Sequence, residues 1–174
     1  MEVHYTRYIG TNASGDKMLF ETDHCLIAIP QRPHVSREEG GHMVIFPKRA
    51  VAERFDQTEE EAIDMLLTSM RLGRAMTEVL CEEGIEIRTI NYQDNGNWYF
   101  LRGEEKPSLH LHLYGRVPNT VNQAFGESLN FPDPNEHPEF YDRNIPLSDE
   151  EAEKIFERFA ELCKPEAGCP PKFI

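Results

Sequence analysis

Apolar and polar residues along the chain follow two different periods, one typical of helices and the other of strands. Apolar residues recur every three or four positions in 58–83 and again in 148–163, which places them on one face of a helix. Each segment opens with Thr or Ser followed three positions later by Glu, the pattern of a capping box. We therefore predict one long helix that ends at Gly84 and one C-terminal helix that ends before Pro165.

Six shorter runs are rich in β-branched and aromatic residues and lie between turn-forming residues, as strands do. These runs are Lys17–Glu21, Cys25–Ile29, His42–Phe46, Ile85–Tyr92, Trp98–Leu101 and Leu109–Tyr114. Three of them precede the long helix and three follow it. This order predicts an α+β fold with a mainly antiparallel sheet of about five to six strands, one long central helix and a C-terminal helix.

The chain carries no repeat, low-complexity tract or Gly/Ser linker, so we predict a single domain over 1–174. A chain of 174 residues is long enough to bury a sizeable core. We expect this core to span about 17–116. It is followed by an irregular arm, 117–147, in which Pro, Asn and Asp recur, and by the C-terminal helix, 148–164.

Composition narrows the class of protein. The 31 acidic residues outnumber the 18 basic ones and give a net charge of −13, which argues against binding to a nucleic-acid polymer. No apolar run approaches the roughly 18 residues that a membrane span needs, and the N-terminus lacks the layout of a signal peptide. The four cysteines form no Cys-x-x-Cys pair, which argues against a disulfide framework or a structural zinc site. We expect a soluble cytoplasmic protein that does not bind membranes.

The segment Ser108–Arg116 alternates strictly between leucines and polar residues. On a strand this places the leucines on one face and His110 and His112, with Ser108 and Tyr114, on the other. The residues alone leave three interpretations open. The histidines could be structural, they could bind a metal with His42 as a third ligand, or one could attack phosphorus as a nucleophile.

An earlier segment favours the third interpretation. His42 opens a four-residue apolar strand that closes with Pro47 and Lys48. Together with the histidine strand, this resembles the histidine triad family of nucleotidyl hydrolases and transferases. Its signature alternates three histidines with apolar residues, and an earlier strand runs from histidine to Pro-Lys. The likeness covers roughly Lys17–Arg116.

The resemblance implies a role for each position of the histidine strand. Ser108 occupies the place of the first histidine, where it keeps a hydrogen-bond donor but not an imidazole. His110 matches the middle histidine, the family's nucleophile, and would carry the nucleotidyl group. His112 matches the third histidine and would contact the phosphate and assist the leaving group.

The resemblance also implies a set of residues that bind substrate. His42 would line the same pocket, and Asn91 resembles the family's asparagine on the phosphate side. The loop before the histidine strand offers Arg102 and Lys106 in place of the usual Gln or Ser, and either could stabilise phosphoryl oxygens. The acidic residue that usually holds the ribose is missing after the strand Cys25–Ile29.

These observations lead to one functional hypothesis and two alternatives. We expect a hydrolase or transferase that attacks the α-phosphate of a nucleoside phosphoramidate or dinucleoside polyphosphate through a covalent nucleotidyl-His110 intermediate. We expect a homodimer with no cofactor and no obligatory metal. The alternatives are a nucleotide-binding module with little turnover and a metal-dependent hydrolase that uses His42, His110 and His112.

Overall fold

The computed structural model describes residues 3–94 and 109–164. Six strands form one sheet in the order β1-β2-β3-β4-β6-β5, and every neighbouring pair is antiparallel. The strands are β1 (Tyr5–Thr11), β2 (Lys17–Thr22), β3 (Cys25–Ile29), β4 (His42–Pro47), β5 (Thr89–Asp94) and β6 (Leu111–Arg116). The long helix α1 spans Glu59–Glu82, the short helix α3 Pro138–Asp142, and the last helix α4 Asp149–Leu162. The α+β fold is thus confirmed.

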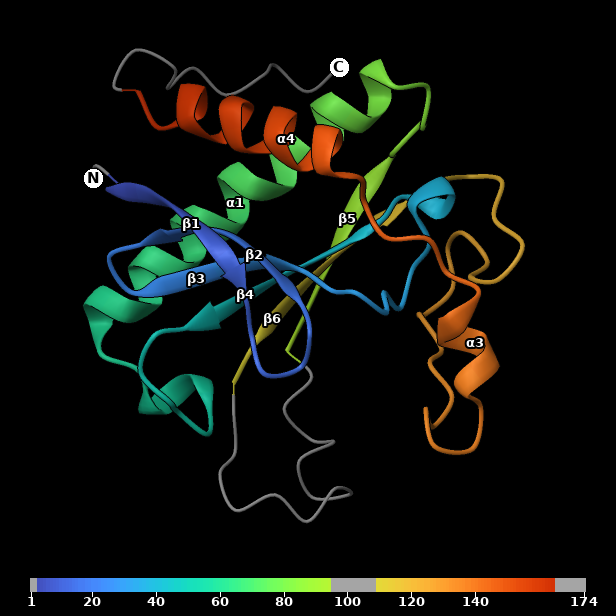
Figure 1. Cartoon of the computed structure of the whole chain (residues 1–174), viewed down its shortest axis with the longest axis horizontal. Helices are drawn as coiled ribbons and strands as arrows, with labels where there is room; N and C mark the ends of the chain where they lie inside the picture. Colours follow the sequence, from blue (N-terminus) through green and yellow to red (C-terminus); the bar gives the residue numbers. More distant parts are fainter. Residues whose placement is uncertain (1–2, 95–108, 165–174) are drawn as a thin grey trace.

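Helices α1 and α4 pack against each other and cover the same face of the sheet (Figure 1). Both helices begin where the sequence predicts, because each capping box forms. The Thr58 and Glu61 side chains accept each other's backbone N–H, and Ser148 and Glu151 do the same. Each helix start therefore satisfies two backbone donors that would otherwise lack partners.

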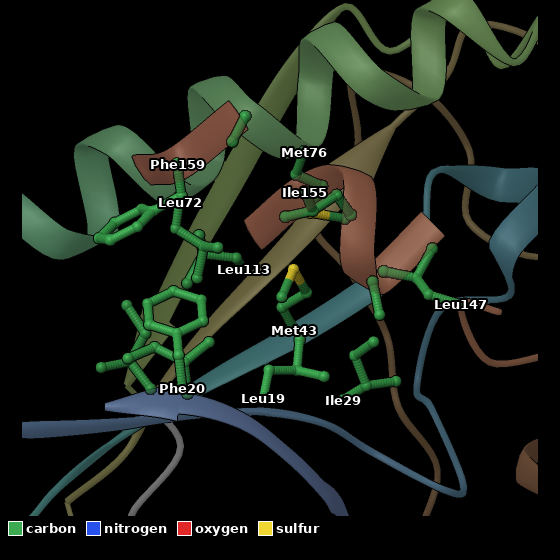
Figure 2. Close-up of a cluster of buried hydrophobic side chains, with 14 of the residues drawn as sticks. Leu19, Phe20, Ile29, Met43, Leu72, Met76, Leu113, Leu147, Ile155 and Phe159 are labelled. Atoms are coloured by element: carbon green, nitrogen blue, oxygen red, sulfur yellow. The ribbon is translucent and has the colours of Figure 1, made fainter. Parts of the chain in front are cut away.

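The hydrophobic core lies between this face of the sheet and the two helices. Figure 2 shows Met43 and Leu113 pointing from the sheet toward Leu72, Met76 and Ile155 on the helices, and all five are essentially inaccessible to solvent. Farther along the sheet, the ring of Phe20 lies 4.6 Å from that of Phe159 on α4. The central strands are therefore apolar on the helix side, and alternation leaves their opposite face for polar residues.

The sequence predictions and the structure differ at three strands. The strand predicted at Leu109–Tyr114 spans Leu111–Arg116, so it begins after His110. Strand β1 was not predicted, because its residues are mostly exposed and show no apolar alternation. The predicted strand Ile85–Tyr92 begins only at Thr89, since Ile85 and Ile87 are buried in the connection that follows the end of α1. The predicted strand Trp98–Leu101 lies outside the described residues.

Two glycines allow the start of β4 to approach the end of β6. A Cβ atom on Gly115 would lie 2.1 Å from the carbonyl oxygen of Gly40, and one on Gly40 would lie 2.4 Å from the Gly115 carbonyl carbon. Gly40 also has a φ of +116°, which favours glycine. The Gly115 N–H donates to the carbonyl of Gly41 at 3.1 Å. This contact fixes the two strands beside each other where His42 begins β4.

The arm, 117–147, contains α3 and otherwise neither helix nor strand. It lies beside the connection between β3 and β4 (Figure 1). Among the described residues, none of the helices combines the length and the apolar character needed to cross a membrane.

Candidate functional site

Four rings gather on the face of the sheet opposite to α1 and α4. His42 on β4 pairs directly with Tyr114 on β6, and Val44 pairs with His112. Because directly paired residues point to the same face, His42, His112 and Tyr114 form one cluster. The ring centroids of His42 and His112 lie 4.9 Å apart, and those of His42 and Tyr114 lie 4.5 Å apart.

His42 and His112 are buried, with 2% and 5% of their surfaces exposed. Burial, together with the neighbouring imidazoles, lowers the pKa of both side chains well below the ordinary value for histidine. Both are therefore neutral at pH 7, and each ring carries a single N–H.

Hydrogen bonds fix which nitrogen carries that proton. The backbone N–H of His34 donates to Nδ1 of His42 at 3.1 Å, so the proton of His42 is on Nε2. This Nε2 lies 2.7 Å from Nδ1 of His112 and donates to it. The proton of His112 is then on its own Nε2, which is buried and has no hydrogen-bond partner among the described residues. The chain of bonds thus ends in a buried donor available to a ligand.

His34 is the fourth ring, and sequence reasoning missed it. It belongs to the connection between β3 and β4, and its Nδ1 lies 2.8 Å from the Tyr114 hydroxyl. Its ring centroid lies 4.8 Å from that of His42 and 5.2 Å from that of His112. The residues around His34 have neither helical nor strand periodicity, so no sequence pattern indicated that it joins the cluster.

His110, the predicted nucleophile, directly precedes β6. Its ring meets that of His112 edge-on, with centroids 4.6 Å apart. Its ring also lies 5.8 Å from the ring of Phe46 on β4, with 28° between the planes. His110 is half-buried. The neighbouring ring, that of His112, carries the buried N–H donor.

Strand β5 lies on the other side of β6 and adds two amides. Asn91, which the sequence analysis assigned to the phosphate side, pairs with Tyr114, and Gln93 pairs with His112. The Gln93 Oε1 atom is buried and has no hydrogen-bond partner in the described part of the chain. Sequence reasoning did not select Gln93, because an isolated Gln on a strand carries no pattern of its own.

Three further predicted site residues, Ser108, Arg102 and Lys106, lie outside the described residues. The structure thus brings together His42, His110 and His112, with Asn91 on the adjacent strand.

A metal ion is the other ligand that a histidine cluster could hold. One nitrogen each of His34, His42 and His112 lie within 4.8 Å of one another, a different trio from the one the sequence suggested. The hydrogen bonds disfavour this use. If Nε2 of His42 bound a metal, its proton would move to Nδ1, which faces the backbone N–H of His34. Two donors would then oppose each other.

Comparison with known proteins is consistent with this arrangement. The sequence profile of the HIT domain, the histidine triad domain, matches residues 12–119. The chain belongs to the histidine triad family. Family membership supports a nucleotide-binding hydrolase or transferase at the level of the family. The match contains every residue of the cluster described above, whereas the arm and α4 lie almost wholly beyond it.

Solved structures of histidine triad proteins share the fold. A zinc-bound histidine triad family protein from Mycobacterium smegmatis has 21% identity and a TM-score of 0.53, with 83% of this chain and 84% of that chain covered. A hypothetical histidine triad nucleotide-binding protein from Sulfolobus tokodaii has 12% identity and a TM-score of 0.54, with coverage of 88% and 89%. A histidine triad protein from Bradyrhizobium japonicum has 13% identity and a TM-score of 0.53, with coverage of 81% and 85%. No curated protein matches the chain.

Proposed function

We propose that this histidine triad protein attacks the α-phosphate of a nucleotide and passes through a covalent nucleotidyl-His110 intermediate. The buried N–H of His112 carries the proposal, because it is a donor without a partner among the described residues, next to the ring of His110. A phosphoryl oxygen would supply the missing acceptor. A ring nitrogen of His110, beside this donor, would act as the nucleophile.

The reaction consists of two displacements. A ring nitrogen of His110 forms a bond to the α-phosphorus while the bond to the leaving group breaks. The leaving group departs with the electron pair and takes up a proton from water, while the N–H of His112 assists it by donating a hydrogen bond. Water then forms a bond to phosphorus, the N–P bond breaks, and a nucleoside monophosphate is released with the loss of the water's proton. Splitting the reaction replaces one poor attack by water with two easier steps.

The substrate class is a nucleoside phosphoramidate or a dinucleoside polyphosphate. His42 and Asn91 would contribute to the phosphate pocket, and Ser108, Arg102 and Lys106 would complete it from the preceding segment. Gln93 joins this set because its side chain shares a face with His112 and has a polar atom without a partner among the described residues. No metal or cofactor is needed for either displacement.

The test is a quench under neutral conditions, since a phosphohistidine bond is labile to acid. Wild type is mixed with an adenosine phosphoramidate, a dinucleoside tetraphosphate or a nucleotidyl sugar, and the adduct is located by mass spectrometry. We expect a nucleotidyl adduct on His110 and its loss in His110→Ala, with nucleotide binding retained. Substitution of the exposed His137 in the arm is the matched control and should leave the adduct intact.

The same experiment distinguishes the alternatives. Full turnover in His110→Ala, or turnover abolished by EDTA without any adduct, would contradict the covalent route and support a metal-dependent hydrolase. Nucleotide binding without adduct or products from the whole panel would indicate a binding module.

We also propose that the protein forms a homodimer through the outer face of α1. Apolar side chains there remain exposed, at 58% for Leu66, 57% for Met70 and 37% for Ile63, and Tyr92 on β5 is 46% exposed. Leu66, Met70 and Tyr92 line a groove of about 370 Å³. Monomeric proteins rarely expose contiguous apolar patches to water. The same face of a second copy of the chain would bury these side chains.

A further inference from the structure

The arm is joined to the histidine cluster by hydrogen bonds at its end. The Asn144 side-chain amide donates to the carbonyls of Pro33 and His34 at 2.8 and 3.1 Å. The next residue, Ile145, receives the N–H of Arg37 at 2.8 Å and donates its own N–H to the Ser36 hydroxyl at 3.0 Å. Asn144 is buried, with 8% of its surface exposed. The connection between β3 and β4 is therefore held by the arm on both sides of Val35.

Two aromatic residues of the arm also pack on the ring of His34. The centroid of Phe131 lies 4.9 Å from it, and that of Tyr141 lies 5.3 Å from it in an edge-on arrangement. Phe131 also contacts the ring of Tyr114 at 5.1 Å. The imidazole of His34 thus lies between the arm and the cluster, and its backbone is the first donor in the chain of hydrogen bonds.

We propose that Asn144 is a positioning residue: by holding the backbone at Pro33 and His34, it fixes the proton on Nε2 of His42 and, through it, the N–H that His112 presents to the substrate. The catalytic part of this inference rests on the proposed function. Only while the His34 N–H points at Nδ1 of His42 is the opposite tautomer of His42 excluded, and Asn144 binds the carbonyl of that same residue.

The experiment compares two buried amides of the arm. Gln123 is 4% exposed and, like Asn144, makes two hydrogen bonds to backbone atoms, in this case the carbonyl and the N–H of Asn130 at 2.7 and 2.9 Å. These bonds stay within the arm. Gln123→Ala therefore measures the effect of loosening the arm itself, whereas Asn144→Ala also releases His34.

The direct readout is the tautomer of each imidazole, from long-range proton–nitrogen NMR correlations of the folded protein. In wild type we expect His42 and His112 each to carry a single proton on Nε2. In Asn144→Ala we expect His42 to become a mixture of tautomers, whereas Gln123→Ala and His34→Ala, which retain the backbone N–H of His34, should keep the wild-type state. Asn144→Leu, which fills the space and lacks the donors, repeats the test if the Ala variant does not fold.

Turnover provides a second readout. We expect kcat of Asn144→Ala to fall by about 10- to 100-fold with KM little changed, the size of effect that misplacement of a reacting group produces. A single Nε2 tautomer of His42 in both Asn144 variants, or an equal change in Gln123→Ala, would overturn the proposal. If wild type turns over no nucleotide but the tautomers shift as described, the proposed function fails and the positioning role of Asn144 stands.

Discussion

The protons of His42 and His112 have defined positions because the ring nitrogens that accept hydrogen bonds each face a specific donor. Nδ1 of His42 can only accept where the His34 N–H faces it, and this decides the state of His112 one bond farther on. Under the proposed function, a phosphate would therefore meet a neutral N–H donor.

The free energy of unfolding should fall as the pH falls, because His42 and His112 are buried in their neutral form. The pKa of His42 and of His112 is lowered in the folded state, whereas in the unfolded chain it is about 6.5. Below pH ~6.5 the unfolded chain therefore binds more protons, and each buried histidine lowers the free energy of unfolding by up to about 1.4 kcal/mol per pH unit. Urea unfolding between pH 7.5 and 5 measures this slope.

Substitution should reduce this dependence on pH. We expect a shallower slope in His42→Asn and in His112→Asn, and the wild-type slope in His137→Asn, which changes an exposed residue of the arm. Equal slopes in all four proteins would show that the buried histidines take up protons without unfolding.

The face of the sheet on which a residue lies could be predicted where residues alternate along a strand. Alternation places His110 and His112 on one face, and His42 was selected because the strand that it opens, which closes with Pro47 and Lys48, resembles that of the histidine triad family. His34 and Gln93 could not be found in this way. Their positions depend on the path of a connection and on the register between β5 and β6, which no local pattern specifies.

At the scale of elements, the approach of Gly40 to Gly115 decides how β4 meets β6. We expect Gly115→Ala to lower the free energy of unfolding by at least about 2 kcal/mol, because its methyl group would collide with backbone atoms that cannot rotate away. Gly10→Ala in β1 is the control, since the atoms nearest to its Cβ would belong to a side chain, that of Tyr8, at 3.2 Å. Chemical denaturation of both variants measures how much each lowers the free energy of unfolding. Equal losses would mean that the backbone between β4 and β6 can shift to accommodate the added methyl group.

The two long helices and the central strands could be predicted because their signals are local. Capping boxes and apolar periodicity indicated α1 and α4, and turn residues bounded β2, β3 and β4. Strand β1 lies at the end of the described strand order, where few side chains need to be apolar. Its pairing with β2 therefore left no hydrophobic pattern to detect.

At the scale of the whole molecule, the exposed apolar face of α1 leads to a prediction about assembly. We expect light scattering at micromolar concentration to give twice the 20.1 kDa of one chain. Met70→Glu should shift the protein toward the monomer, because it places a charge in the groove next to Leu66. Val121→Glu, which alters a residue of the arm that is 94% exposed, should leave the mass unchanged. A wild type that stays at the mass of one chain would contradict the dimer.

The hydrogen bonds that join the arm to the histidine cluster could not be predicted from the sequence. Asn144 contacts residues 110 and 111 positions earlier in the chain, and a single hydrogen bond over such a separation has no counterpart in local sequence. Proline and Asn/Asp content indicated only that the segment is irregular.

The division of the sheet into an apolar face and a histidine face has a consequence for how this protein tolerates change. Along 109–114, neighbouring positions serve different purposes: Leu111 and Leu113 are core residues, whereas His110 and His112 lie at the proposed site. A saturation scan that scores abundance and turnover separately should therefore give two interleaved profiles, each repeating every second residue. Abundance should be most sensitive at the leucines. Turnover per folded molecule should be most sensitive at the histidines. Folding and catalysis would thus constrain alternate positions of the same strand.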